Sequence, residues 1–109
     1  TEEMSSEKLK KGVYIAVQVQ KERFKDLNIN YNSQMNSKQI EYYCKLESDA
    51  EKLIQMFFKS SKLTARSYHR LLKVARTIAD MEQSEKIKQN HIAEAISFRK
   101  TYSKYWEKI

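Results

Sequence analysis

The sequence has 109 residues, with 21 lysines and arginines against 14 aspartates and glutamates, a net charge of +7, one glycine and no proline. This length suits one domain with its own core, and so little glycine and proline excludes a fold of strands and tight turns. We therefore predict a single all-α domain over residues 1–109, a compact bundle of about five helices excised from a longer chain.

The composition also limits the cellular compartment and the classes of binding partner that can be expected. The one cysteine excludes an intramolecular disulfide, and no apolar run reaches the roughly 20 residues that a membrane-spanning helix needs. We expect a cytoplasmic protein without membrane association. The basic balance is compatible with nucleic acid, nucleotide phosphate or an acidic protein as a partner, and charge alone does not choose among them.

The first predicted helix runs from Ser5 or Ser6 to about Lys25. Gln20 and Arg23 fall within or beside its apolar arc, where a buried amide needs partners, so we expect Gln20 to make a structural hydrogen bond to a nearby loop. Gly12 lies at the edge of the arc, where another helix could approach closely. Residues 26–36 hold four asparagines and no regular period, which indicates an ordered surface loop.

Two shorter helices follow. Asn36 and Gln39 have the spacing of a capping box, which predicts a helix that ends near Lys45. Cys44 in this segment has no histidine at ligand spacing, so we interpret it as a small buried side chain and not as a nucleophile. A third helix, from Ser48 to about Lys59, carries a broad apolar stripe and belongs mostly to the core.

The fourth helix extends from the cap Thr64 to about Glu82 and separates its residues into two arcs. The apolar arc predicts a core-facing side and consists of Tyr68, Leu71, Leu72, Ala75, Ile78 and Ala79. The opposite arc predicts a basic outer face and consists of Arg66, His69, Arg70, Lys73 and Arg76. A last helix is predicted from about Gln89 to Trp106.

The basic face is the main candidate for binding. Arg66, Arg70 and Lys73 follow the helical spacing i, i+4, i+7, with Arg76 alongside. Arg66 stands in the first turn, where free amides and the positive end of the helix dipole also favour an anion. We therefore predict a phosphate ligand at Arg66, Arg70, Lys73 and Arg76. A solvated face is an equally good interpretation for Lys73 and Arg76.

Arg99 is anomalous because it lies within the apolar stripe of the last helix. A guanidinium there must be paired or must reach the edge of the core. Asp80, near the end of the preceding helix, is the predicted partner in a structural ion pair.

Several kinds of site are excluded by missing motifs. One glycine cannot build the GxxxxGK[ST] loop that wraps nucleotide phosphates, and no GxSxG, HExxH or CxxC occurs. His91 and Glu94 lie one helical turn apart, but a di-iron bundle needs ExxH twice and two further carboxylates. We predict no metal site.

The segment LTARSYHRLLKVARTIAD, followed by IKQNHIAEAI and FR, resembles the C-terminal domain of the magnesium-chelatase-related AAA+ ATPases of the ComM/YifB type. The likeness extends upstream through Gln20, Arg23 and Phe24, then INYNSQM at 29–35 and the Tyr-Cys-x-Leu around Cys44. It covers about residues 5–99.

The resemblance implies a helical lid that follows a P-loop ATPase core in a bacterial protein. It further implies that this protein forms a homo-oligomeric ring, a hexamer, and binds ATP and Mg²⁺ through the core. It implies that Arg66 is the sensor-2 arginine, which reaches the γ-phosphate at the subunit interface. ComM-type relatives imply a link to competence and DNA remodelling. Two alternatives stay open: a stand-alone basic module that binds DNA or an acidic protein, and the lid of a true magnesium chelatase subunit.

Overall fold

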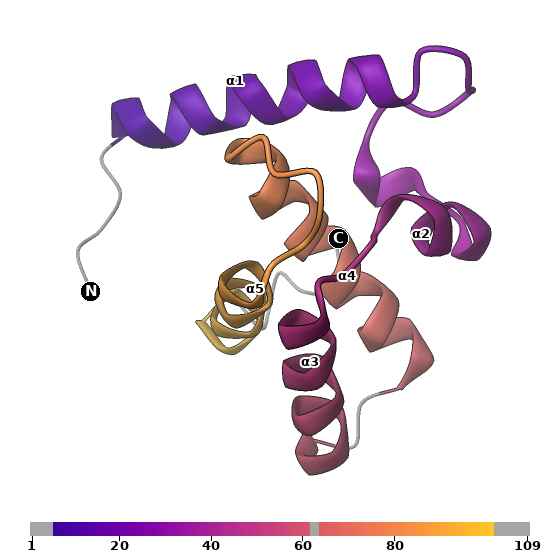
Figure 1. The fold of residues 1–109 in the computed structure, drawn as a ribbon. Helices are drawn as coiled ribbons and strands as arrows, with labels where there is room; N and C mark the ends of the chain where they lie inside the picture. Colours follow the sequence, from indigo (N-terminus) through magenta and orange to yellow (C-terminus); the bar gives the residue numbers. More distant parts are fainter. Residues whose placement is uncertain (1–5, 62–63, 102–109) are drawn as a thin grey trace.

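The computed structural model describes residues 6–61 and 64–101 (Figure 1). Five α-helices and one 3-10 turn make up the described part of the chain, which confirms the all-α prediction. Their bounds are α1 Ser6–Arg23, η1 Asn32–Gln34, α2 Ser37–Tyr43, α3 Ser48–Ser61, α4 Ala65–Met81 and α5 Gln89–Thr101. The predicted extension of the last helix to Trp106, and its C-terminal residues from Tyr102 on, lie outside the described residues.

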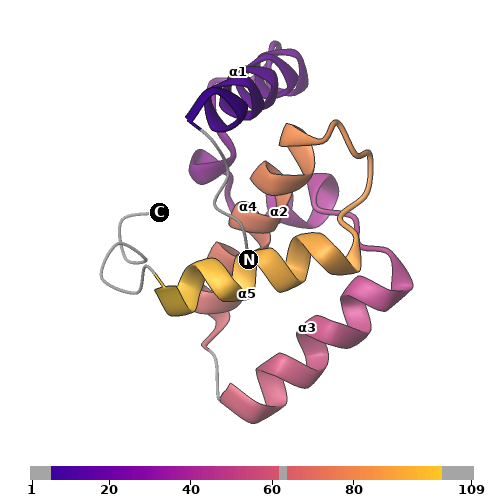
Figure 2. The same cartoon turned by 90° about the vertical axis from the view of Figure 1, so that its left-hand side faces the viewer.

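Helix α4 is the centre of the arrangement. It packs against α1, η1, α2 and α5, and α5 packs in turn against α3. In Figure 1, α1 lies across the C-terminal end of α4. Seen from the side in Figure 2, α5 runs between α1 and α3, with α4 behind it. A helix with neighbours on several sides must bury more than one face.

Side-chain caps fix where two of the helices begin. The Asn36 Oδ1 atom accepts from the Gln39 amide at 2.9 Å, and the Gln39 side chain accepts from the Asn36 amide at 2.9 Å. Thr64 Oγ1 accepts from the Ser67 amide at 3.1 Å. Both caps satisfy amides that have no partner inside the helix, and both confirm the predicted helix starts.

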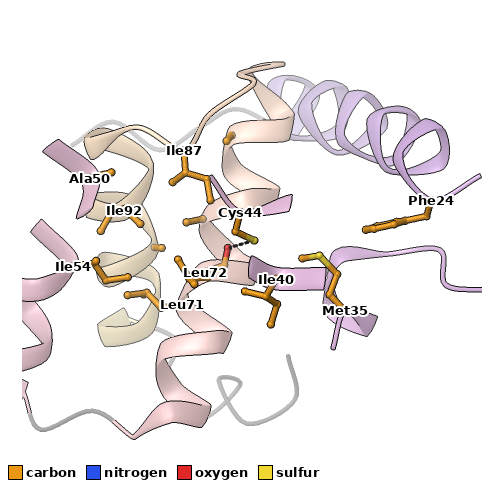
Figure 3. Packing of buried hydrophobic residues seen from close by; sticks show 13 residues of the cluster. Phe24, Met35, Ile40, Cys44, Ala50, Ile54, Leu71, Leu72, Ile87 and Ile92 are labelled. Carbon is orange, nitrogen blue, oxygen red and sulfur yellow. Dashed lines mark hydrogen bonds between the residues drawn. The ribbon is translucent and has the colours of Figure 1, made fainter. Parts of the chain in front are cut away.

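The apolar core lies where α2, α3, α4 and α5 converge, as Figure 3 shows. Its fully covered members include Ile54, Leu71, Ile87 and Ile92. Ile87 also pairs with the chain before α3: its amide donates to the Lys45 carbonyl at 2.8 Å, and its carbonyl accepts from the Glu47 amide at 2.9 Å. This short bridge ties the α4–α5 connector to the α2–α3 connector.

Cys44 belongs to this core. Its side chain is only 6% exposed, and its Sγ atom lies 3.9 Å from the Leu72 carbonyl (Figure 3). Burial raises the pKa of the Cys44 thiol to about 11. The prediction that Cys44 is a small buried side chain is confirmed.

The close approach expected at Gly12 occurs against the end of α4. A Cβ atom added at Gly12 would lie 2.6 Å from the terminal methyl of Met81. In the described part of the chain, no helix is long and apolar enough to cross a membrane.

Candidate functional site

A basic groove of about 530 Å³ lies between the first half of α4 and the start of α2. Four of its lining residues are basic or imidazole side chains, and all four come from α4. None of the described residues that line the groove is acidic. The lining residues are Met35, Asn36, Ser37, Ile40, Arg66, His69, Arg70 and Lys73.

Arg66 is the exposed cation of this groove. It is the second residue of α4, two residues after the cap Thr64, so the backbone amides of the first turn lie beside it. An exposed guanidinium with planar donors beside a helix N-terminus suits a phosphate oxygen. Arg66 is therefore exposed at the groove, and its contact with an anion stays a prediction.

Arg70 and Lys73 line the same groove at a deeper level. Arg70 is 5% exposed. Lys73 is half-buried, and its Nζ atom donates to the Ser33 carbonyl of η1 at 3.0 Å. Burial lowers the pKa of Lys73, and the nearby Arg70 charge lowers it further. The ammonium of Lys73 therefore lies in an electrostatically unfavourable environment that an anion would relieve.

Arg76 is not part of the groove, and neither interpretation made from the sequence is correct. Its side chain is 2% exposed, and its Nε atom donates to Asp80 at 3.0 Å. Its other nitrogens donate to the carbonyls of Glu85, at 2.9 Å, and Ser84. The sequence pattern assumed an outer face here, but the turn after α4 folds back over Arg76. Burial lowers the pKa of Arg76, and Asp80 opposes that effect.

Asp80 is the fully buried centre of a polar network that joins α1, η1 and α4. Arg23 of α1 donates to both carboxylate oxygens, at 2.7 and 2.8 Å. The Asn32 amide group donates to the same carboxylate at 2.9 Å. With Arg76 as the third donor, Asp80 holds two arginines and one asparagine.

The ion pairs that the described residues form with Asp80 therefore involve Arg23 and Arg76, not Arg99, so the predicted partner was wrong. Arg99 is ten residues beyond the start of α5, which places it about 15 Å along that helix. Asp80 lies in the last turn of α4, where α1 crosses. Arg23 had a signal in the sequence, because a charged residue beside the apolar arc of α1 needs a buried partner.

Gln20 has the structural role that was expected. Its Oε1 atom accepts from the Asn32 amide at 2.9 Å and so attaches η1 to α1. Gln20 therefore holds Asn32. Arg23, one turn further along α1, holds Asp80, which is a partner of Asn32 in the same network.

His91 also has a structural role. It is fully buried, its Nδ1 atom accepts from the Lys88 amide at 2.9 Å, and its Nε2 atom lies 2.7 Å from Glu82. Because Nδ1 is an acceptor, the proton of the neutral ring is on Nε2 and points to the carboxylate. Glu94 is exposed, and the described residues contain no group of three side chains that could hold a metal ion.

The chain is similar in sequence to a described protein family and to several known proteins. Residues 3–99 match the family described as magnesium chelatase, subunit ChlI C-terminal. The chain is 38% identical over 95 residues, 87% of its length, to the protein YifB of Salmonella typhimurium. It is 43% identical over 68 residues, 62% of its length, to the competence protein ComM of Haemophilus influenzae and, over the same length, to YifB of Escherichia coli.

The matched segments make up only 13 to 18% of these relatives' own lengths. The family match, by contrast, spans nearly the whole chain, including α1 with Arg23, η1, and the α4 helix that carries Arg66. This chain therefore belongs to the family of magnesium chelatase ChlI C-terminal domains and is similar to the corresponding part of ComM and YifB.

Proposed function

We propose that this domain is the C-terminal lid of a ComM/YifB-like AAA+ ATPase and that Arg66 reaches the γ-phosphate of ATP held at an interface of the ring. The observation that carries the proposal is the exposure of Arg66 at a basic groove whose other α4 arginine, Arg70, is buried. Arg70 is buried and Arg76 is engaged with Asp80 and backbone carbonyls. Arg66 is thus the α4 arginine that can approach a group held by another domain.

The local chemistry fits a phosphate group. The groove has cationic side chains without an acidic neighbour among its described lining residues, and the helix start adds amide donors. When phosphoryl transfer builds negative charge on the γ-phosphate oxygens, a guanidinium at fixed distance stabilises that charge. The cap at Thr64 and the packing of α4 hold Arg66 in place before the substrate binds.

ATP and Mg²⁺ would be bound chiefly by a P-loop core elsewhere in the parent chain. This chain would contribute Arg66, with His69 and Lys73 nearby in the groove. We further propose that the parent forms a homo-oligomeric ring, as a hexamer, and that ATP hydrolysis by the ring drives DNA remodelling. The similarity to a protein named for competence supports this part of the proposal.

The test is the ATP turnover of the full-length parent with Arg66→Ala. We expect kcat to fall by about tenfold or more, because a positioned charge on the transition state is lost. Lys52→Ala removes an exposed charge from α3 and is the matched control, with turnover unchanged. Normal turnover in Arg66→Ala would refute the proposal.

The rival function, a stand-alone module for DNA, predicts a different result for the 109-residue chain alone. Such a module would bind duplex DNA with an affinity that falls steeply as salt rises, because each phosphate contact releases counterions. The lid predicts at most weak DNA binding by this chain. Steep, salt-dependent binding in the isolated chain would therefore support the rival.

A further inference from the structure

We propose that Lys73 is a second phosphate-contacting residue of the basic groove and that the groove takes the phosphate chain of a nucleotide in preference to a DNA backbone. The inference rests on the proposed function in so far as it takes phosphate to be the ligand. It adds that the site extends from Arg66 to Lys73 and that Lys73 contacts phosphate. It also adds that the ligand is the phosphate chain of a nucleotide and not a DNA backbone.

The spacing of the cations favours a chain of phosphates over a single ion. Arg66 and Lys73 are seven residues apart on one face of α4, which separates their positions by about 10 Å along the helix. His69 lies between them and lines the same groove. A linear polyanion lying along α4 would meet donors at both ends and in the middle.

Lys73 has donor capacity left for such a ligand. An ammonium group has three N–H donors, and among the described residues Lys73 makes one hydrogen bond, to the Ser33 carbonyl. Burial and the charge of Arg70 lower the pKa of Lys73, so its positive charge is poorly compensated in this environment. An anion in the groove would supply the missing compensation without requiring the Ser33 contact to break.

The shape of the groove disfavours the backbone of duplex DNA. A duplex is a convex rod whose phosphates meet side chains that extend into solvent, whereas Lys73 is half-buried inside a hollow with Arg70, 5% exposed, at the same level. The exposed basic face of α4 ends at Lys73, because the next basic residue, Arg76, is buried. A groove-sized ligand with concentrated charge fits this geometry better.

The experiment is a titration of the 109-residue chain with inorganic triphosphate, followed by NMR of the lysine side chains. We expect weak binding, with a Kd on the order of 1 mM, and a rise in the pKa of Lys73 toward its ordinary value of 10.5. Lys73→Gln should weaken triphosphate binding about tenfold, because one charged contact is lost. Lys73→Arg should largely retain it, and Lys52→Gln on α3 should leave it unchanged.

Circular dichroism of each variant establishes that the helices are intact; Arg66→Gln, at an exposed position, gives a second variant that should also weaken binding. Two results would overturn the inference. One is equal triphosphate binding by Lys73→Gln and the unaltered chain. The other is a short duplex DNA that binds more tightly than triphosphate and depends on Lys73.

The outcome is separable from the test of the proposed function. If Lys73 responds to triphosphate but Arg66→Ala leaves ATP turnover of the parent unchanged, the groove is a phosphate site and the sensor role of Arg66 fails. If turnover depends on Arg66 but Lys73 does not respond to triphosphate, the sensor role stands and this inference fails.

Discussion

Asp80 has no exposed surface and is surrounded by donors from three elements. Taking a carboxylate and two guanidinium groups out of water costs several kcal/mol for each ion, and close pairing with further hydrogen bonds offsets that cost. The bidentate contact with Arg23 has the geometry that best achieves this. We therefore expect the network to specify how α1 docks on α4 more than it adds net stability.

The first prediction concerns Asp80→Asn, which has nearly the same shape but no charge. Arg23 and Arg76 would both lose their buried counterion, so we expect the free energy of unfolding to fall by roughly 3–5 kcal/mol. Urea denaturation measures the change. Asp49→Asn, at an exposed position of α3, is the matched control and should change stability by less than about 0.5 kcal/mol. A loss below 1 kcal/mol for Asp80→Asn would show that the pairs are unimportant.

The second prediction is a pH dependence that originates from Cys44. Its folded pKa, about 11, lies above the ordinary value of 9.0, so the folded state retains its proton while the unfolded thiol ionises. Stability should be unaffected by this group below pH 9 and should decrease as the pH rises from 9 to 11. The two values correspond to a loss of about 2 to 3 kcal/mol at most.

Lysines and tyrosines also titrate in this range, so the Cys44 contribution is the difference between the unaltered chain and Cys44→Ala. The free energy of unfolding of Cys44→Ala should fall less steeply between pH 9 and 11. Equal slopes for the two proteins would contradict a raised thiol pKa.

At the scale of elements, α4 is the helix around which the others are placed. Its N-terminal half has the basic groove on one side, and its C-terminal half is enclosed by α1 and by the turn that Arg76 holds. At Gly12 in the contact between α1 and α4, a Cβ atom would meet the terminal methyl of Met81 at 2.6 Å. The neighbouring atom is the far end of a flexible, half-buried side chain.

The third prediction concerns Gly12→Ala. The added Cβ would push only the Met81 methyl, which can rotate away, while alanine is favoured over glycine in a helix by about 1 kcal/mol. We therefore expect a gain in the free energy of unfolding of about 0.5–1 kcal/mol. Gly12→Val adds branches that the flexible methyl cannot avoid and is the comparison variant. Marked destabilisation by alanine would mean that Met81 is held rigidly.

Local patterns predicted most of the elements. Cap residues and apolar spacing located the starts of α2 and α4 because those signals act within one or two turns of the chain. The prediction of a basic outer face on α4 was only half correct, because periodicity gives the direction of a side chain and not what covers it. Arg66 and Arg76 have the same chemistry, and long-range packing of α1 and of the connector after α4 separates their roles.

The partner of Asp80 was a long-range feature as well. Arg23 precedes it by 57 residues, and no pattern within one helix specifies that distance. The family resemblance did include Gln20 and Arg23, yet it did not say what they contact. Their function became visible only when η1 placed Asn32 beside both Arg23 and Asp80.

On the scale of the whole molecule, the buried polar network lies toward the C-terminal end of α4 and the basic groove lies along its first half. The Asp80 network and the Ile87 bridge connect α1, η1 and both connectors to the central helix. That framework positions α4 within the domain, and Arg66, in the first turn of this helix, lines the groove. A rigid support and an exposed charge are what a domain needs to deliver one arginine to a phosphate on another domain.

The most direct test of this account measures ATP turnover and domain stability together for Arg66→Ala in the full-length parent protein. We predict that turnover falls about tenfold or more while the free energy of unfolding of the domain changes by less than about 0.5 kcal/mol. Arg76→Ala should instead destabilise the domain. Unchanged turnover in Arg66→Ala, or a loss of turnover matched by loss of the fold, would contradict the assignment of Arg66 as the phosphate-contacting residue.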